Sequence, residues 1–80
     1  MKITVDEDCI ARGNPASGTR CPVALAMLKA GLSDPIVTKK NISYWPTGSP
    51  PMWIDTPHVA AVFICKLDEG LPVEPFEFEL

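Results

Sequence analysis

The stretch that decides the fold is residues 21–31, which read CPVALAMLKAG. Pro22 suits the first position of a helix, where its missing N–H would have no partner, and Gly31 suits the helix end. After Val23 the residues between them are strong helix formers, and Lys29 is the only charged one. A helix this apolar must be largely buried. We therefore expect it to lie across a sheet.

Both ends of the sequence alternate polar and apolar residues, which is the period of a half-buried strand. Residues 2–5 alternate, and residues 76–80 alternate strictly. In the second segment we expect the apolar side chains to face the core and the carboxylates to face water, namely Phe76, Phe78 and Leu80 against Glu77 and Glu79. If these two strands are neighbours, the sequence leaves their relative direction open.

The middle of the sequence predicts a hairpin. Residues 36–38 and 42–45 are rich in β-branched and aromatic residues, and they flank residues 39–41. Residues 33–35 are expected to form a turn before this hairpin. Residues 46–51, with three prolines and one glycine, are expected to form a loop after it.

Two further helices complete the expected fold. Asp6 is expected to cap a short helix over residues 7–12, and Thr56-Pro57 to begin a longer helix over residues 59–69. The stripe expected on this longer helix is Val59, Val62, Phe63 and Leu67. The order of elements predicts a single domain over residues 1–80 of the α+β class. It would be a small two-layer sandwich, with helices packed on one face of a mainly antiparallel sheet of three to four strands.

Composition narrows the classes of function. The chain has 80 residues, of which 46% are hydrophobic and 21% are charged, as in globular domains. Ten acidic and seven basic side chains give a net charge of −3, which argues against a general nucleic-acid binder. No apolar run approaches the roughly 20 residues needed to cross a bilayer, so we expect no membrane partner.

The cysteines are Cys9, Cys21 and Cys65. Because their number is odd and their spacing is wide, we expect free thiols, no disulfide framework and no cofactor or metal. Cys21 lies at a helix start beside Arg20, and both effects lower the pKa of a thiol. It is therefore either a reactive thiolate or a packed residue at a helix end. The alternative function is a small thiol- or zinc-dependent module using Cys21 with Cys9, Cys65 or His58.

Two groups of residues are candidates for binding a partner. Two tryptophans, a tyrosine and a methionine flank the loop at 46–51, where they would either anchor a partner or close the core as a lid. Carboxylates gather at both ends of the chain, in residues 6–8 and 74–79. Neighbouring terminal strands would merge them into an anionic patch that mimics nucleic acid, although ordinary solubility explains them as well. The predicted contact residues are Tyr44, Trp45, Met52, Trp53, Glu74, Glu77 and Glu79.

Two motifs carry a resemblance. Residues 20–26 read RCPVALA, and residues 67–80 read LDEGLPVEPFEFEL. In this order they resemble short uncharacterised proteins of phages, prophages and plasmids. The resemblance implies a mobile-element setting, in which small proteins often bind host machinery.

From this setting we expect a non-enzymatic protein in the cytoplasm of a bacterial host. It would bind a host protein or complex and inhibit it, with anti-defence activity, including an anti-CRISPR type, as the most concrete form. Direct binding to nucleic acid is not expected. An exposed outer strand such as residues 76–80 could also pair with its copy, so a homodimer is open.

Overall fold

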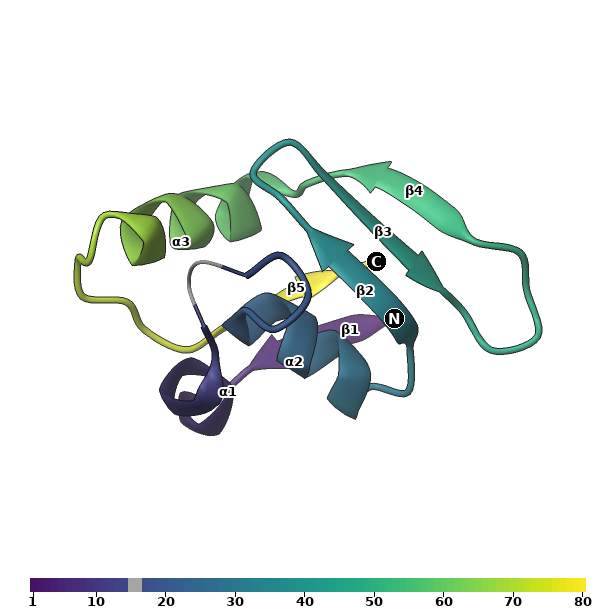
Figure 1. Ribbon diagram of the computed structural model, residues 1–80, viewed down its shortest axis with the longest axis horizontal. Coiled ribbons are helices and arrows are strands. Elements are labelled where there is room, and N and C mark those ends of the chain that lie inside the picture. The colour runs from purple at the N-terminus through teal and green to yellow at the C-terminus, as the bar shows by residue number, and fades with distance from the viewer. Residues whose placement is uncertain (15–16) are drawn as a thin grey trace.

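The computed structural model describes residues 1–14 and 17–80, and it has the expected α+β class. Within these residues the helices are α1 (Glu7–Arg12), α2 (Pro22–Lys29) and α3 (His58–Asp68). The strands are β1 (Lys2–Val5), β2 (Ser33–Val37), β3 (Asn41–Trp45), β4 (Met52–Asp55) and β5 (Phe76–Glu79). They form two antiparallel sheets, one of β1 and β5 and one in the order β2-β3-β4 (Figure 1).

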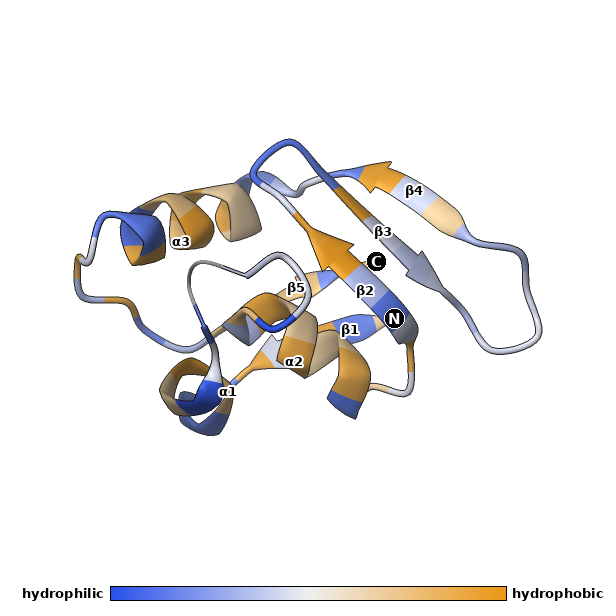
Figure 2. Ribbon diagram, viewed as in Figure 1, coloured by the Kyte–Doolittle hydropathy of each residue, from blue (hydrophilic) through white to orange (hydrophobic). Residues whose placement is uncertain are grey.

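The helix over residues 21–31 organises the fold as predicted. Cys21 is the N-cap, Pro22 begins α2, and Gly31 follows the helix end with a φ of +92°. α2 packs against β1, β2 and α1, and Figure 2 shows apolar colours over most of its length. Its buried residues are Pro22, Val23, Ala24, Ala26 and Met27.

The terminal strands are neighbours, and the structure gives the direction that the sequence left open. β1 and β5 run antiparallel, with Ile3 opposite Phe78 and Thr4 opposite Glu77. Ile3 and Phe78 are buried, whereas Glu77 is exposed, so the predicted alternation of the last strand is confirmed.

The three-stranded sheet has one covered and one open face. Val37 and Ile42 lie opposite each other and are buried, as is Tyr44 two residues further along β3. α2 packs against β2, and α2 and the two-stranded sheet lie on the covered side (Figure 1). On α3, the ring of Phe63 contacts the ring of Phe76 in β5 at 4.7 Å between centroids, so α3 and β5 share one core.

Two local predictions were wrong and one strand was not predicted. Residues 33–35 are not a separate turn but the irregular start of β2, where Asp34 has a φ of +48°. Residues 52–55 form the unpredicted strand β4. Thr56 does not cap α3, whose N-cap is Pro57, because the hydroxyl of Thr56 donates to the carbonyl of Thr38 at 2.7 Å.

The buried face of α3 is rotated from the predicted stripe. The buried side chains are those of Ala60, Phe63 and Ile64, with Leu67 packed against them. Val59 and Val62 are 46% and 40% exposed. The helix is apolar on most sides, so its packing partners and not its sequence decide which stripe is covered.

Candidate interaction surface

The open face of the three-stranded sheet carries a row of large apolar side chains. Cross-strand pairing places Ile36 of β2 and Trp53 of β4 on either side of Ser43 of β3. Trp45 lies two residues further along β3 and shares this face. Ile36 is 51%, Trp45 48% and Trp53 76% exposed. We call Ile36, Trp45 and Trp53 the aromatic patch.

The small side chain of Ser43 makes the patch concave. A hollow of ≈ 310 Å³ lies on this face, and Ile36, Ser43, Trp45 and Trp53 contribute to its lining. Its other lining residues are Asp34, Tyr44, Pro51 and Met52. A hollow bordered by two indole rings can receive an apolar side chain from a partner protein.

Local hydrogen bonds hold the strands of the patch in register. At the hairpin tip, the N–H of Thr38 donates to the carbonyl of Asn41 at 2.9 Å, and the N–H of Asn41 donates to the hydroxyl of Thr38 at 3.0 Å. The N–H of Thr56 donates to the carbonyl of Lys40 at 3.0 Å. These bonds join the end of β4 to the β2–β3 turn. At this end of the sheet the register of the three strands that carry the patch is therefore fixed by hydrogen bonds.

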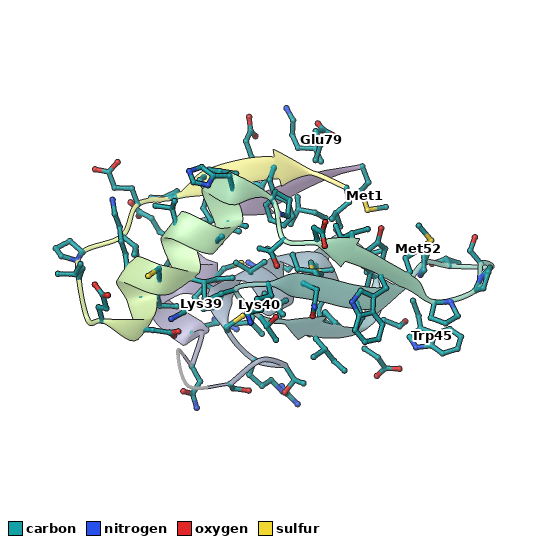
Figure 3. The ribbon with its side chains drawn as sticks, turned by 90° about the horizontal axis from the view of Figure 1, so that it is seen from above. Met1, Lys39, Lys40, Trp45, Met52 and Glu79 are labelled. Atoms are coloured by element: carbon teal, nitrogen blue, oxygen red, sulfur yellow. The ribbon has the colours of Figure 1, made fainter. Side chains whose placement is uncertain are left out.

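The four residues predicted as contacts around the loop at 46–51 do not share one surface in the structure. Trp45 and Trp53 belong to the patch, but Tyr44 is buried in the core, with 7% of its surface exposed. Met52 lies opposite Tyr44, at the edge of the covered face, and is 43% exposed. Figure 3 shows Trp45 and Met52 at the same end of the molecule. The placement of Tyr44 corrects its prediction as a contact residue.

Ile36 is the patch residue that the sequence analysis missed. Its place beside Ser43 and Trp53 depends on the pairing register of the strands, which no local pattern reveals. The alternation of Ile42, Ser43, Tyr44 and Trp45 along β3 did contain the signal that Tyr44 and Trp45 face opposite sides.

The predicted anionic patch is divided by positive charges. Glu77 lies 3.6 Å from the ammonium group of Lys2, and Glu79 lies 3.5 Å from the amino group of Met1. Figure 3 shows Met1 and Glu79 close together. Glu74 is exposed in the segment that leads into β5.

At the start of α1, Lys29 lies 3.5 Å from Asp6 and 2.9 Å from Asp8. A hydrogen bond from the backbone N–H of Cys9 lowers the pKa of Asp6, and a hydrogen bond from Lys29 lowers the pKa of Asp8. Asp6 therefore caps α1, and both carboxylates pair with Lys29 at the end of α2.

The thiols have surroundings unlike those of a nucleophile. Cys9 and Cys21 are buried, and Cys65 is partly exposed. Burial raises the pKa of the Cys21 thiol, so the lowering expected from Arg20 and the helix N-terminus is wrong. His58 is exposed at the start of α3. In the part of the chain that the structure describes, no three His, Cys, Asp or Glu side chains converge as a metal site would require.

The helices of residues 1–14 and 17–80 are all too short or too polar to cross a membrane. Comparison of the chain with protein-family models, with curated proteins and with solved structures gives no match.

Proposed function

We propose that this chain is a non-enzymatic interaction protein that binds a host protein through the aromatic patch and inhibits it. The observation that carries the proposal is the exposure of Trp53, at 76%, on a paired strand beside Trp45 and Ile36. Tryptophan is the residue most enriched among those that dominate binding energy at protein interfaces. Residues on paired strands also lose less backbone entropy on binding than residues of a free loop do.

The surroundings of the patch indicate what its partner offers. Asp34 and Asp55 are exposed at the ends of the two outer strands that frame it. An apolar centre with a charged rim is the usual anatomy of a protein interface. We therefore expect the partner to present an apolar side chain to the hollow and basic groups to the rim.

The mobile-element origin and the inhibition rest on the resemblance of residues 20–26 and 67–80 to short phage, prophage and plasmid proteins. Occlusion of a host surface requires no catalytic group and suits a chain of this size. Anti-defence activity, including inhibition of a CRISPR complex, is the most concrete form of the proposal. The glutamates at 74, 77 and 79 would form a second, weaker contact surface.

The test begins with capture of a partner from host lysate by tagged protein. The patch variant is Trp45→Ser with Trp53→Ser. The matched control is Val59→Ser with Leu71→Ser, because these apolar side chains are 46% and 48% exposed but lie outside the patch. The captured protein is then purified, and its own activity is measured while each variant is added.

The expected result is a specific partner that the unmodified chain and the control bind and inhibit, and that the patch variant neither binds nor inhibits. Equal binding by the patch variant would remove the aromatic patch from the proposal. Binding without any loss of the partner's activity would contradict the inhibitor function.

A further inference from the structure

The outer edge of β4 presents unpaired backbone groups. β4 stands at one end of the sheet order β2-β3-β4. Since the N–H of Thr56 bonds to Lys40 of the facing chain, the antiparallel alternation makes Ile54–Ile42 and Met52–Tyr44 the hydrogen-bonded pairs. The N–H and C=O groups of Trp53 and Asp55 therefore point away from β3, toward solvent.

Two of the other outer strands, β2 and β5, carry features that hinder pairing with a second copy. On β2, the N–H of Val37 is already bonded to the carbonyl of Gly18 at 2.8 Å. On β5, the residues that alternate with Phe76 and Phe78 are Glu77 and Glu79. Pairing of β5 with its copy would set carboxylate against carboxylate, which is a common protection of sheet edges. Within the described residues, the edge of β4 has neither a backbone hydrogen bond to another segment nor carboxylates that would face each other in the pair. It also carries Trp53, the more exposed of the two tryptophans.

We propose that β4 pairs antiparallel with β4 of a second copy of this chain, with Ile54 facing the partner's Ile54 across a two-fold axis. In this register Trp53 lies opposite the partner's Asp55, and each of these two pairs exchanges both of its backbone hydrogen bonds. The two three-stranded sheets become one continuous sheet. The inference does not depend on the proposed function.

The sequence around Ile54 selects this register. Pro51 and Pro57 lie three positions before and after Ile54. In the dimer, Pro51 of each copy therefore lies opposite the partner's Pro57, outside the two pairs that form backbone hydrogen bonds. If the register is shifted in either direction by one residue on each strand, Pro51 or Pro57 comes to lie opposite a residue whose carbonyl needs an N–H donor. Proline has no backbone N–H, so this hydrogen bond is lost. The preferred register also places no like charges directly opposite each other.

Pairing through β4 has a consequence for the aromatic patch. A two-fold axis perpendicular to the sheet leaves the open faces of both copies on the same side. The two patches then form one apolar surface, with both Trp53 side chains near the seam. The indole of Trp53 gains a neighbour in the partner's Asp55 and loses part of its exposure to water.

Cysteine cross-linking tests the register. In a background with Cys65→Ser, Ile54→Cys places two thiols at a non-hydrogen-bonded pair, where Cα atoms approach to about 4.5 Å. This separation lies within the roughly 4.4–6.8 Å that a disulfide spans. The matched control is Trp53→Cys in the same background, because its thiol would lie opposite the partner's Asp55 and not opposite its own copy.

With oxidised glutathione, Ile54→Cys is expected to give a covalent dimer of twice 8.7 kDa, and Trp53→Cys is expected to stay monomeric. A mixture of Trp53→Cys and Asp55→Cys is expected to cross-link. Light scattering of the unmodified chain over a range of concentrations should show the same dimer, which keeps the test valid if a variant fails to fold. A mass of 8.7 kDa at every concentration, or equal cross-linking by Trp53→Cys, would overturn the proposal.

Discussion

The sulfur of Cys21 accepts a hydrogen bond from the backbone N–H of Ala24 at 3.5 Å. The thiol at the start of α2 is therefore a helix cap buried among apolar side chains. This relationship replaces the reactive nucleophile that the neighbouring Arg20 suggested.

The rates of alkylation of the cysteines should differ according to how deeply each thiol is buried. We expect Cys65 to react first with iodoacetamide and Cys21 to react more slowly than a free thiol in a peptide, because the pKa of Cys21 is raised by burial. Mass spectrometry of samples quenched over time measures both rates. Faster labelling of Cys21 than of Cys65 would restore the reactive-thiol function.

The thiol of Cys21 is expected to make the free energy of unfolding depend on pH in the alkaline range. A folded-state pKa above the ordinary 9.0 means that the unfolded chain loses this proton first. The contribution of this thiol to the free energy of unfolding should therefore be fully present at neutral pH and be lost as the pH rises past 9.0. Urea unfolding at several alkaline pH values measures this slope, and Cys21→Ser should reduce it. An unchanged slope in Cys21→Ser would show that the thiol is not its source.

At acid pH the first helix is the sensitive element. The pKa of Asp6 is lowered chiefly by the N–H of Cys9, so its contribution to stability is present above 3.8 and is lost as the pH falls through the lower, folded pKa. Asp6→Asn is expected to flatten the acid end of the stability curve. Glu7→Gln is the control, because Glu7 lies in the same turn but does not provide the cap. The idea fails if both variants behave alike in urea unfolding at acid pH.

Exposure of Trp53 and burial of Tyr44 predict opposite effects on stability. Trp53→Ala should leave the thermal midpoint nearly unchanged, because 76% of its surface is already in water. Tyr44→Ala should lower the free energy of unfolding by about 3–5 kcal/mol, as for other large aromatic residues in cores. Differential scanning calorimetry compares the two. A large loss with Trp53→Ala would make this residue a lid on the core and not a contact residue.

Gly13 is fixed by a close approach to Pro22. A Cβ atom built on Gly13 overlaps the proline ring at the start of α2. Gly13→Ala should cost about 1–3 kcal/mol, as overpacking does elsewhere. Gly18→Ala is the milder comparison, because its Cβ would lie 3.1 Å from the carbonyl oxygen of Val37. Equal stability of the two variants by urea unfolding would contradict this packing.

Sequence reasoning located the elements whose signals are local. α2 has Pro22 at its start, Gly31 after its end and apolar residues between, and the terminal strands alternate with a period of two. β4 was missed because Met52, Trp53 and Ile54 are all apolar and directly follow two prolines, so no polar–apolar alternation marks a strand. The exposed side of α3 was misplaced because Val59, Val62, Phe63 and Ile64 are all apolar, and only the contact with Phe76 decides between them.

Part of the interaction surface could be predicted from the sequence, because some of its residues carry local signals. Trp45 and Trp53 stand out as aromatic residues beside a loop, and the alternation along β3 already separates Trp45 from Tyr44. Ile36 and the hollow over Ser43 depend on the pairing of three strands. That arrangement is a property of the whole sheet and not of any one segment.

The pairing of β1 with β5 also sets the order in which this chain can fold. The β2–β3 hairpin closes through a two-residue turn and can form early, since short loops close fast. β1 must wait for a strand at the other end of the described chain, and contacts between distant residues slow folding. Ile3 and Val5 can pack against α2 before then, but both are fully buried only in the finished fold. The two-stranded sheet is therefore completed only when β5 pairs with β1, which joins the two ends of the described chain.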